Sequence, residues 1–149
     1  MHTLTNCSFE NNTATRGGGV YSSGRSSIVA RSLLFLSNTA GSGGGLYWSV
    51  ERPQLLNATF DANIADHGPD TASSAVIAEW VGLDASDQEA ASGEAVPFPL
   101  TVRLLDYYRQ VTTLDNTARL TVMSNDSDAR LSGKVEATVQ RGEFTFQEG

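Results

Sequence analysis

The sequence predicts an all-β protein in two parts, residues 1–72 and residues 73–149. The first part carries a repeat whose Phe residues are spaced 26 and then 25 positions apart. The second part carries short segments in which apolar and polar residues alternate, as in half-buried strands. Between the strand segments of the second part, residues 84–95 have no apolar periodicity, which marks a linker or loop.

Composition and charge limit the classes of partner. The chain has 149 residues, with 10 Lys and Arg against 17 Asp and Glu, for a formal charge of −7. Binding to nucleic acid needs clustered cations, so this negative charge argues against nucleic acid as a partner. Apolar runs such as residues 33–36 are far shorter than the roughly 20 residues that cross a bilayer, so no membrane insertion by this segment is expected. One Cys and two His offer no disulfide and no structural zinc site, so no metal or other cofactor is expected.

The repeat combines two short motifs. A Phe-x-x-Asn motif occurs three times, and a Gly-Gly motif followed by an apolar residue and Tyr occurs twice. The residues that recur are Phe9, Phe35 and Phe60, then Asn12, Asn38 and Asn63, and finally Gly18 and Gly44. In the third copy the glycine motif is replaced by residues 68–70, Gly-Pro-Asp, which is expected of a terminal copy.

Each copy is rich in turn formers and has no segment long enough for a helix, so the repeat is predicted to be a coil of short strands. Strands of successive coils would pair in parallel at about 4.8 Å and place equivalent side chains above one another. The three Phe residues then form an internal column, and Cys7, Leu33 and Ala58 form a second inward column. The three Asn residues are expected to take left-handed backbone angles in a turn, with their amides bonded as a ladder. The glycines fit a second tight corner, where no side chain can be accommodated.

These motifs resemble the repeats of chlamydial polymorphic outer membrane proteins and of pectin-lyase-like surface proteins. The resemblance covers about the first half of the chain and implies about three terminal coils of a right-handed parallel β-helix. Because the open edge of such a slab would expose unpaired backbone and the Phe column, the helix is expected to continue covalently upstream of residue 1. Residues 1–149 alone are therefore not expected to form a soluble monomer that melts cooperatively.

The second part is predicted to be a small antiparallel sandwich. Its turn signals are residues 125–128 and 141–142. The predicted strands are residues 75–81, 100–105, 118–123, 135–139 and 143–146. Residues 99–111 and 142–146 resemble immunoglobulin-like modules of surface proteins, whose usual turn is Asp-x-x-Gly-x-x-Val. Here Arg109 stands in the Gly position. The resemblance implies an incomplete immunoglobulin-like β-sandwich, truncated after the strand at 143–146.

No catalytic or metal-binding set of residues is predicted. Glu10 and Asp61 hold the same repeat position with Leu36 between them, so they would stand about 9 to 10 Å apart on stacked strands, which favours solvated carboxylates. Residues 19–26 approach a phosphate loop and residues 125–128 approach a calcium loop, but a coil corner and a hairpin turn explain them better. His67 has no His or Cys partner nearby and is expected to be a satisfied or exposed turn residue.

Two further surface features leave alternatives open. Tyr21, Tyr47 and Trp48 could line a sugar-stacking face, although a stacked column explains the two Tyr residues more simply. Of four Asn-x-Ser/Thr sequons, Asn11 and Asn125 are the candidate glycosylation sites, because both lie in predicted turns. Asn6 and Asn57 adjoin inward strand positions and are expected to be less accessible.

The resemblance implies a non-enzymatic extracellular or cell-surface segment for adhesion or structural display, with a surface protein or a glycan as partner. Two alternatives remain at this level. One is a non-catalytic piece of a carbohydrate-active β-helix enzyme, of the polysaccharide lyase or glycosidase type. The other is a structural component of a cell wall or matrix. Fold alone does not choose among them.

Overall fold

The computed structural model describes residues 1–25, 27–82, 100–122 and 136–146. Every regular element in these residues is a β-strand, so the predicted all-β class is confirmed for this part of the chain. None of the described elements is a helix long and apolar enough to cross a membrane. The predicted linker at residues 84–95 lies outside the described residues.

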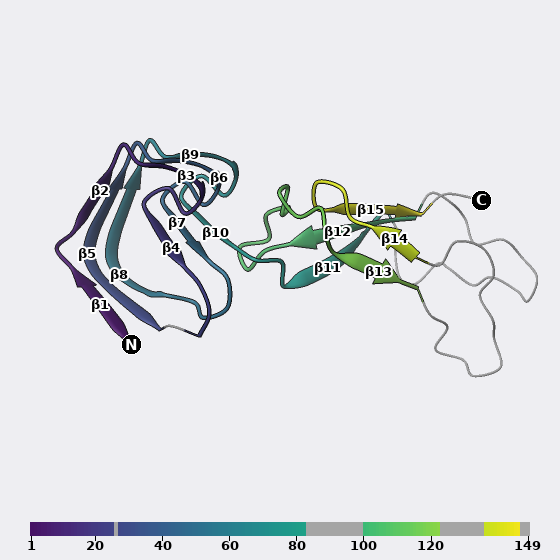
Figure 1. Ribbon diagram of the computed structural model, residues 1–149, viewed down its shortest axis with the longest axis horizontal. Coiled ribbons are helices and arrows are strands. Elements are labelled where there is room, and N and C mark those ends of the chain that lie inside the picture. Colours follow the sequence, from purple (N-terminus) through teal and green to yellow (C-terminus); the bar gives the residue numbers. More distant parts are fainter. Residues whose placement is uncertain (26, 83–99, 123–135, 147–149) are drawn as a thin grey trace, which may run out of the picture.

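Residues 1–73 form three parallel sheets, which together we call the repeat stack (Figure 1). The first sheet joins β1 (His2–Thr5) and β2 (Ser8–Glu10) to one side of β5 (Ile28–Leu36), with β8 (Gln54–Asp61) on its other side. The second sheet has the order β3 (Thr13–Arg16), β6 (Thr39–Ser42), β9 (Ile64–His67). The third has the order β4 (Val20–Ser22), β7 (Leu46–Trp48), β10 (Thr71–Ser73).

The chain visits the three sheets in the same order three times, so each pass lies beside the previous one. Pairing follows the repeat: Phe9 lies opposite Phe35, and Phe35 lies opposite Phe60. In the second sheet Ala14, Ala40 and Ala65 pair in the same way. The sequence repeat and the strand register therefore coincide.

Left-handed backbone at matching positions turns the chain between these strands. The first such position falls at the bend within β5 and β8 and the other two at sheet corners. The residues are Asn6, Ser32 and Asn57, then Asn11, Ser37 and Ala62, then Gly17, Gly43 and Gly68. The prediction that Asn12, Asn38 and Asn63 themselves are left-handed is wrong by one residue. The preceding residue bends the chain, which turns the Asn side chain along the stack instead of into solvent.

The three Phe rings form a column at the centre of the stack. The ring centroids of Phe9 and Phe35 lie 5.2 Å apart, and those of Phe35 and Phe60 lie 4.7 Å apart with planes within 4°. Phe35 has no exposed surface and packs with Leu33, Leu46 and other apolar side chains in one cluster. Phe9 and Phe60 are only half-buried, because each lies at an outer pass of the stack.

The second half contains two antiparallel groups of strands. β12 (Leu100–Leu105) pairs with both β11 (Ile77–Val81) and β15 (Glu143–Phe146). β13 (Arg119–Thr121) pairs with β14 (Glu136–Thr138). Buried Val102, Val139 and Phe144 form their common core. Each of the five predicted strand segments contains one of these strands, although residues 123 and 135 and the turn at 125–128 are not described.

The turn after β12 keeps its geometry despite the Arg. Arg109 has φ +62°, the conformation that Gly adopts most easily. The Asp106 carbonyl accepts a hydrogen bond from Arg109 N at 3.0 Å, and Asp106 N donates to the Gln110 carbonyl at 2.9 Å. The Arg109 guanidinium also pairs with Glu79. A non-Gly residue in this conformation costs about 1 to 2 kcal/mol, so the closed turn must be held by other contacts.

Replacing Phe35 by Ala tests the central column. The substitution removes a fully buried ring and leaves a cavity between two other rings, which should lower the free energy of unfolding by about 3–5 kcal/mol. Urea denaturation measures the change. Leu56→Ala is the matched control, because Leu56 is 41% exposed on the neighbouring strand and should cost about 0.5 kcal/mol. Equal costs for the two variants would show that the column is not the core of the stack.

Candidate functional site

The predicted Asn residues form a ladder of amide hydrogen bonds along the stack. Asn12 Nδ2 donates to Asn38 Oδ1 at 3.0 Å, and Asn38 Nδ2 donates to Asn63 Oδ1 at 3.1 Å. Backbone atoms extend it: Asn38 Nδ2 also donates to the Phe9 carbonyl, and Asn63 Nδ2 to the Phe35 carbonyl. Asn38 has no exposed surface, so the ladder satisfies polar groups that water cannot reach.

The ladder has a direction, and it ends at the third pass. Asn63 Nδ2 donates to Asp70 Oδ1 at 3.3 Å. Asp70 occupies the repeat position that Gly19 and Gly45 hold in the first two copies. The carboxylate therefore caps the last amide in place of a fourth Asn.

Gly18 and Gly44 lie where successive passes approach most closely. A Cβ on Gly18 would stand 2.4 Å from the Gly44 carbonyl oxygen, and a Cβ on Gly44 would stand 2.3 Å from the Pro69 carbonyl oxygen. Both distances are too short for any side chain. Pro69 itself holds this position in the third copy, beyond which the stack has no further pass among the described residues.

The sequons and the paired acidic residues lie on the surface. Asn11 is exposed, but so are Asn6 and Asn57, so exposure gives no reason to prefer Asn11 over them. Asn125 lies outside the described residues. Glu10 and Asp61 both pair with Leu36, from opposite sides. Nowhere in the described ranges do three His, Cys, Asp or Glu side chains gather as a metal site would require.

A buried carboxylate, which stands in the Asp position of the turn motif before Arg109, joins the two halves of the chain. Asp106 has no exposed surface. Its Oδ2 accepts hydrogen bonds from Ser73 N and from His67 Nε2, both at 3.1 Å. Its Oδ1 accepts from Tyr108 N at 2.8 Å and Gln110 N at 2.9 Å. One side chain thus holds both the last strand of the repeat stack and the turn that contains Arg109.

His67 extends this network into the stack. Its Nδ1 lies 3.1 Å from Ser42 Oγ, which is the equivalent position one pass earlier. Burial lowers the pKa of His67 below its usual value, the nearby Arg16 charge lowers it further, and Asp106 opposes both. A neutral ring that donates from Nε2 to Asp106 and accepts at Nδ1 from Ser42 satisfies all three groups. His67 is therefore a satisfied residue at the junction, not an exposed one.

Ser42, His67 and Asp106 include the residue types of a hydrolytic triad, but their setting is that of a fixed joint. Ser42 is 2% exposed and His67 is 3% exposed. The Ser42 hydroxyl is bonded to His67 Nδ1, and almost none of its surface is exposed. The Asp106 carboxylate is also committed to three backbone N–H groups. The arrangement is suited to fixing the second half against the stack.

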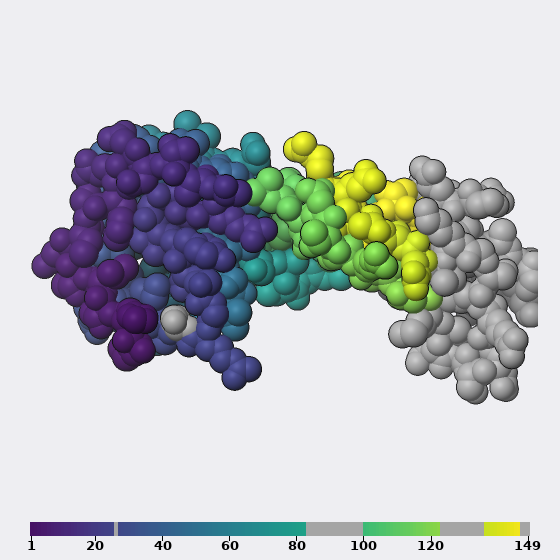
Figure 2. Space-filling view, in the orientation of Figure 1, coloured from purple at the N-terminus to yellow at the C-terminus, as the bar shows by residue number. Residues whose placement is uncertain are grey.

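Aromatic side chains make a second contact between the halves. Tyr107 lies edge-on to Trp48, with ring centroids 5.7 Å apart. The Arg52 guanidinium lies 4.4 Å from the centre of the Tyr107 ring and donates to its hydroxyl at 2.7 Å. Tyr107 N donates to Ser73 Oγ at 3.0 Å. Figure 2 shows the two halves in direct contact, without a gap between them.

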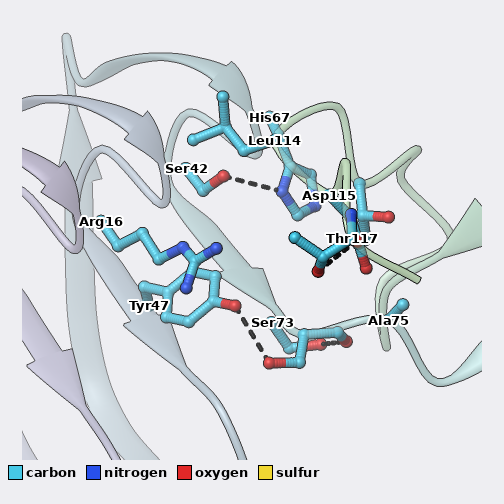
Figure 3. Close-up of a pocket in the computed structure, with 11 residues that line it drawn as sticks. Arg16, Ser42, Tyr47, His67, Ser73, Ala75, Leu114, Asp115 and Thr117 are labelled. Carbon is cyan, nitrogen blue, oxygen red and sulfur yellow. Dashed lines mark hydrogen bonds between the residues drawn. The ribbon is translucent and has the colours of Figure 1, made fainter. Parts of the chain in front are cut away.

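A polar cavity of about 160 Å³, which we call the junction pocket, lies beside this network (Figure 3). Strands of the repeat stack form one wall, and the segment after β12 forms the other. Arg16 and Tyr47 lie on the stack side, and Asp115 and Thr117 face them from the second half. The remaining lining residues are Ser42, His67, Ser73, Ser74, Ala75, Thr112 and Leu114.

These features define an all-β repeat protein with a polar site at the junction of its two halves. Residues 6–23 match the family model described as the Chlamydia polymorphic membrane protein (Chlamydia_PMP) repeat. The match runs from the bend before β2 to just after β4, and so covers the first pass except for β1. It links this pass to a repeat found in membrane proteins that are associated with the cell surface. No curated protein and no solved structure matches the chain.

One sequence signal could have located the junction. The position four residues after the ladder Asn is occupied by Arg16, Ser42 and His67, all of them polar and all different. The Phe and Asn positions of the repeat, in contrast, keep one residue type. This column is the one whose last residue, His67, contacts the second half of the chain. Asp106, 39 residues beyond His67, stands in the Asp position of the turn motif that contains Arg109, which marks the turn but not its contact with His67.

Replacing Asn38 by Asp should break the ladder at its buried centre. The change keeps the shape but removes the donors to the Phe9 carbonyl and Asn63 Oδ1, and it buries a charge. We expect a loss of at least about 3 kcal/mol in the free energy of unfolding at pH 8. Urea midpoints at pH 8 and pH 5 measure it, with Asn12→Asp as the exposed control. A loss no larger than that of the control would contradict a role for the ladder.

The depressed pKa of His67 predicts a pH dependence of stability. Below the unfolded-state pKa of about 6.5, the unfolded chain takes up a proton that the folded state resists, so stability falls as the pH falls. Above that pH the contribution is complete. The charged groups that act on the ring are Asp106 and Arg16.

Urea midpoints between pH 7.5 and pH 5 measure this effect in the wild type and in His67→Gln. The variant should lose the part of the slope that comes from His67. His2→Gln is the matched control, because it removes the chain's other histidine, which is exposed in β1 and outside the junction. An unchanged slope in His67→Gln would exclude the ring as its source.

Proposed function

We propose that this chain is a non-enzymatic extracellular or cell-surface segment used for adhesion or structural display. The observation that carries the proposal is the in-register stacking of three passes, in a chain whose first pass matches a polymorphic membrane protein repeat. In this proposal the repeat stack is part of a right-handed parallel β-helix, and residues 73–149 belong to an immunoglobulin-like sandwich. The buried junction fixes the two as one rigid unit.

Rigidity is what a display segment needs, and several features supply it. Backbone hydrogen bonds, the Phe column and the Asn ladder all run from pass to pass along the stack. At its end the second half is not tethered by a single strand, because Asp106 and Tyr107 hold it at separate points. A binding surface at one end of this unit would thus keep a fixed orientation relative to the opposite end.

We further propose that the β-helix continues upstream and pairs with the edge formed by β1 to β4. Asn12 Oδ1 accepts no hydrogen bond within the described residues, although Asn38 Oδ1 and Asn63 Oδ1 each accept two. A preceding coil with an Asn at the same position would supply that donor. It would also cover the half-buried Phe9 and the exposed ring of Tyr21.

The partner is proposed to be a surface protein or a glycan. A net charge of −7 disfavours nucleic acid and anionic lipid as partners. Exposed aromatic and arginine side chains near the junction, such as Tyr107 and Arg52, are of the types enriched where proteins bind other molecules. They lie on the rigid unit and do not depend on the sequons, whose modification requires a eukaryotic secretory pathway.

Protease treatment of intact source cells tests the location. An antibody against residues 100–122 follows the protein while trypsin acts from outside. Display at the surface predicts loss of the signal within the time in which a cytoplasmic marker of the same cells stays intact. Protection of both proteins in intact cells, with digestion of both after lysis, would refute the proposal.

A further inference from the structure

The junction pocket holds polar groups that neither the fold nor the display role uses. Its volume of about 160 Å³ is below the roughly 300–1,000 Å³ of sites for drug-sized ligands. On the same measure one water needs roughly 10–15 Å³, so the pocket has room for more than a single water and can take one small ring. Its walls come from both halves of the chain and are held in place by the buried network behind them.

Two opposite charges face each other across this pocket (Figure 3). The Arg16 guanidinium lies 5.5 Å from the centre of the Tyr47 ring, and no carboxylate of the described residues forms an ion pair with it. On the other wall, Asp115 Oδ1 accepts hydrogen bonds from Thr117 N, Thr117 Oγ1 and Ala118 N at 3.1 to 3.4 Å. Asp115 Oδ2 receives no hydrogen bond in the described ranges, so one acceptor stays available.

A pair of hydroxyl groups adds adaptable capacity at the same site. Tyr47 Oη and Ser74 Oγ lie 3.0 Å apart, and either atom can be the donor. Whichever group accepts in this pair keeps its own hydrogen free for a ligand. The stack side of the pocket can therefore donate from Arg16 and either donate or accept at the hydroxyl pair.

The charge arrangement selects the chemistry of the ligand. An anion would be attracted by Arg16 but repelled by Asp115. A simple cation would be attracted by Asp115 but repelled by Arg16. An ammonium group donates three hydrogen bonds, but besides Asp115 Oδ2 the acceptors named above are the hydroxyl pair on the wall that carries the Arg16 charge, which repels it. A neutral polyol satisfies both walls, because each hydroxyl can accept at one side and donate at the other. A six-membered ring that carries several hydroxyl groups also matches the volume.

We propose that the junction pocket binds one neutral hexopyranose unit. One sugar hydroxyl accepts from the Arg16 guanidinium, and another donates to Asp115 Oδ2. Hydrogen bonds to charged groups are the stronger ones, so these two side chains should determine affinity. The inference rests on the proposed display function, in which the sugar would be a terminal unit of a surface glycan.

Saturation-transfer NMR and calorimetry with the full chain test the inference. The probes are the methyl pyranosides of glucose, mannose and galactose, and a trisaccharide that ends in each sugar. N-acetylneuraminic acid and alanine serve as anionic and zwitterionic probes. We expect at least one neutral sugar to bind, free or as the terminal unit, with a dissociation constant in roughly the millimolar range or tighter.

Two variants test the contacts. Arg16→Gln and Asp115→Asn should each weaken binding about tenfold or more, since each removes a charge-assisted hydrogen bond. Asp115→Asn keeps the Oδ1 acceptor for the Thr117 turn, and thermal melting verifies that both variants stay folded. Arg31→Gln is the matched control, because Arg31 is exposed on the first sheet and should leave binding unchanged.

Absence of binding by every neutral sugar would overturn the inference. So would binding of only the acid or the amino acid, or binding that both variants leave intact. Each of these results leaves the protease experiment untouched, so the failure of the sugar site and the failure of surface display can be told apart.

Discussion

Parallel pairing in register is the constraint on which the rest of the structure depends. Because each pass lies beside an equivalent pass, every side chain stands next to its own counterpart from another copy. Only residues that pack well beside a copy of themselves can recur at equivalent positions of the repeat. Phe rings stack, Asn amides donate to and accept from one another, and Gly leaves room for a carbonyl oxygen. Like charges placed side by side repel each other, and in this stack Leu36 lies between Glu10 and Asp61.

The same constraint explains why the interesting chemistry lies where the repeat fails. In the third copy Asp70 replaces a Gly and caps the Asn ladder, and Ala72 replaces the stacked Tyr. His67 stands where Arg and Ser stood before, and it carries the contact to Asp106. Residues that no longer need to match a following pass are free to bind something else. Here they bind the second half of the chain and enclose a pocket with it.

Whether a feature of the structure could be predicted from the sequence depends on the range of the interactions that create it. The columns of Phe and Asn were predictable, because a repeat spacing fixes which residues become neighbours. The handedness of single residues was not, and the left-handed bend falls on Asn11, Ser37 and Ala62 instead of the ladder Asn. The Phe-x-x-Asn motif shows that a turn is present. The left-handed residue is the one before the Asn, because the Asn side chain must point along the stack to form the ladder. Arg109 shows the converse, since a turn held by Asp106 keeps its geometry with an unfavourable residue.

By itself, the sequence determined the all-β fold class, the register of the repeat and the residues that stack. These follow from the repeat period, which can be read directly from the spacing of residues in the sequence. Only the tertiary structure decided that His67 is buried, that Asp106 bonds both halves, and that Arg16 and Asp115 face each other across a pocket. These contacts join residues 33 to 99 positions apart, and no periodic pattern records which distant side chain completes a hydrogen bond.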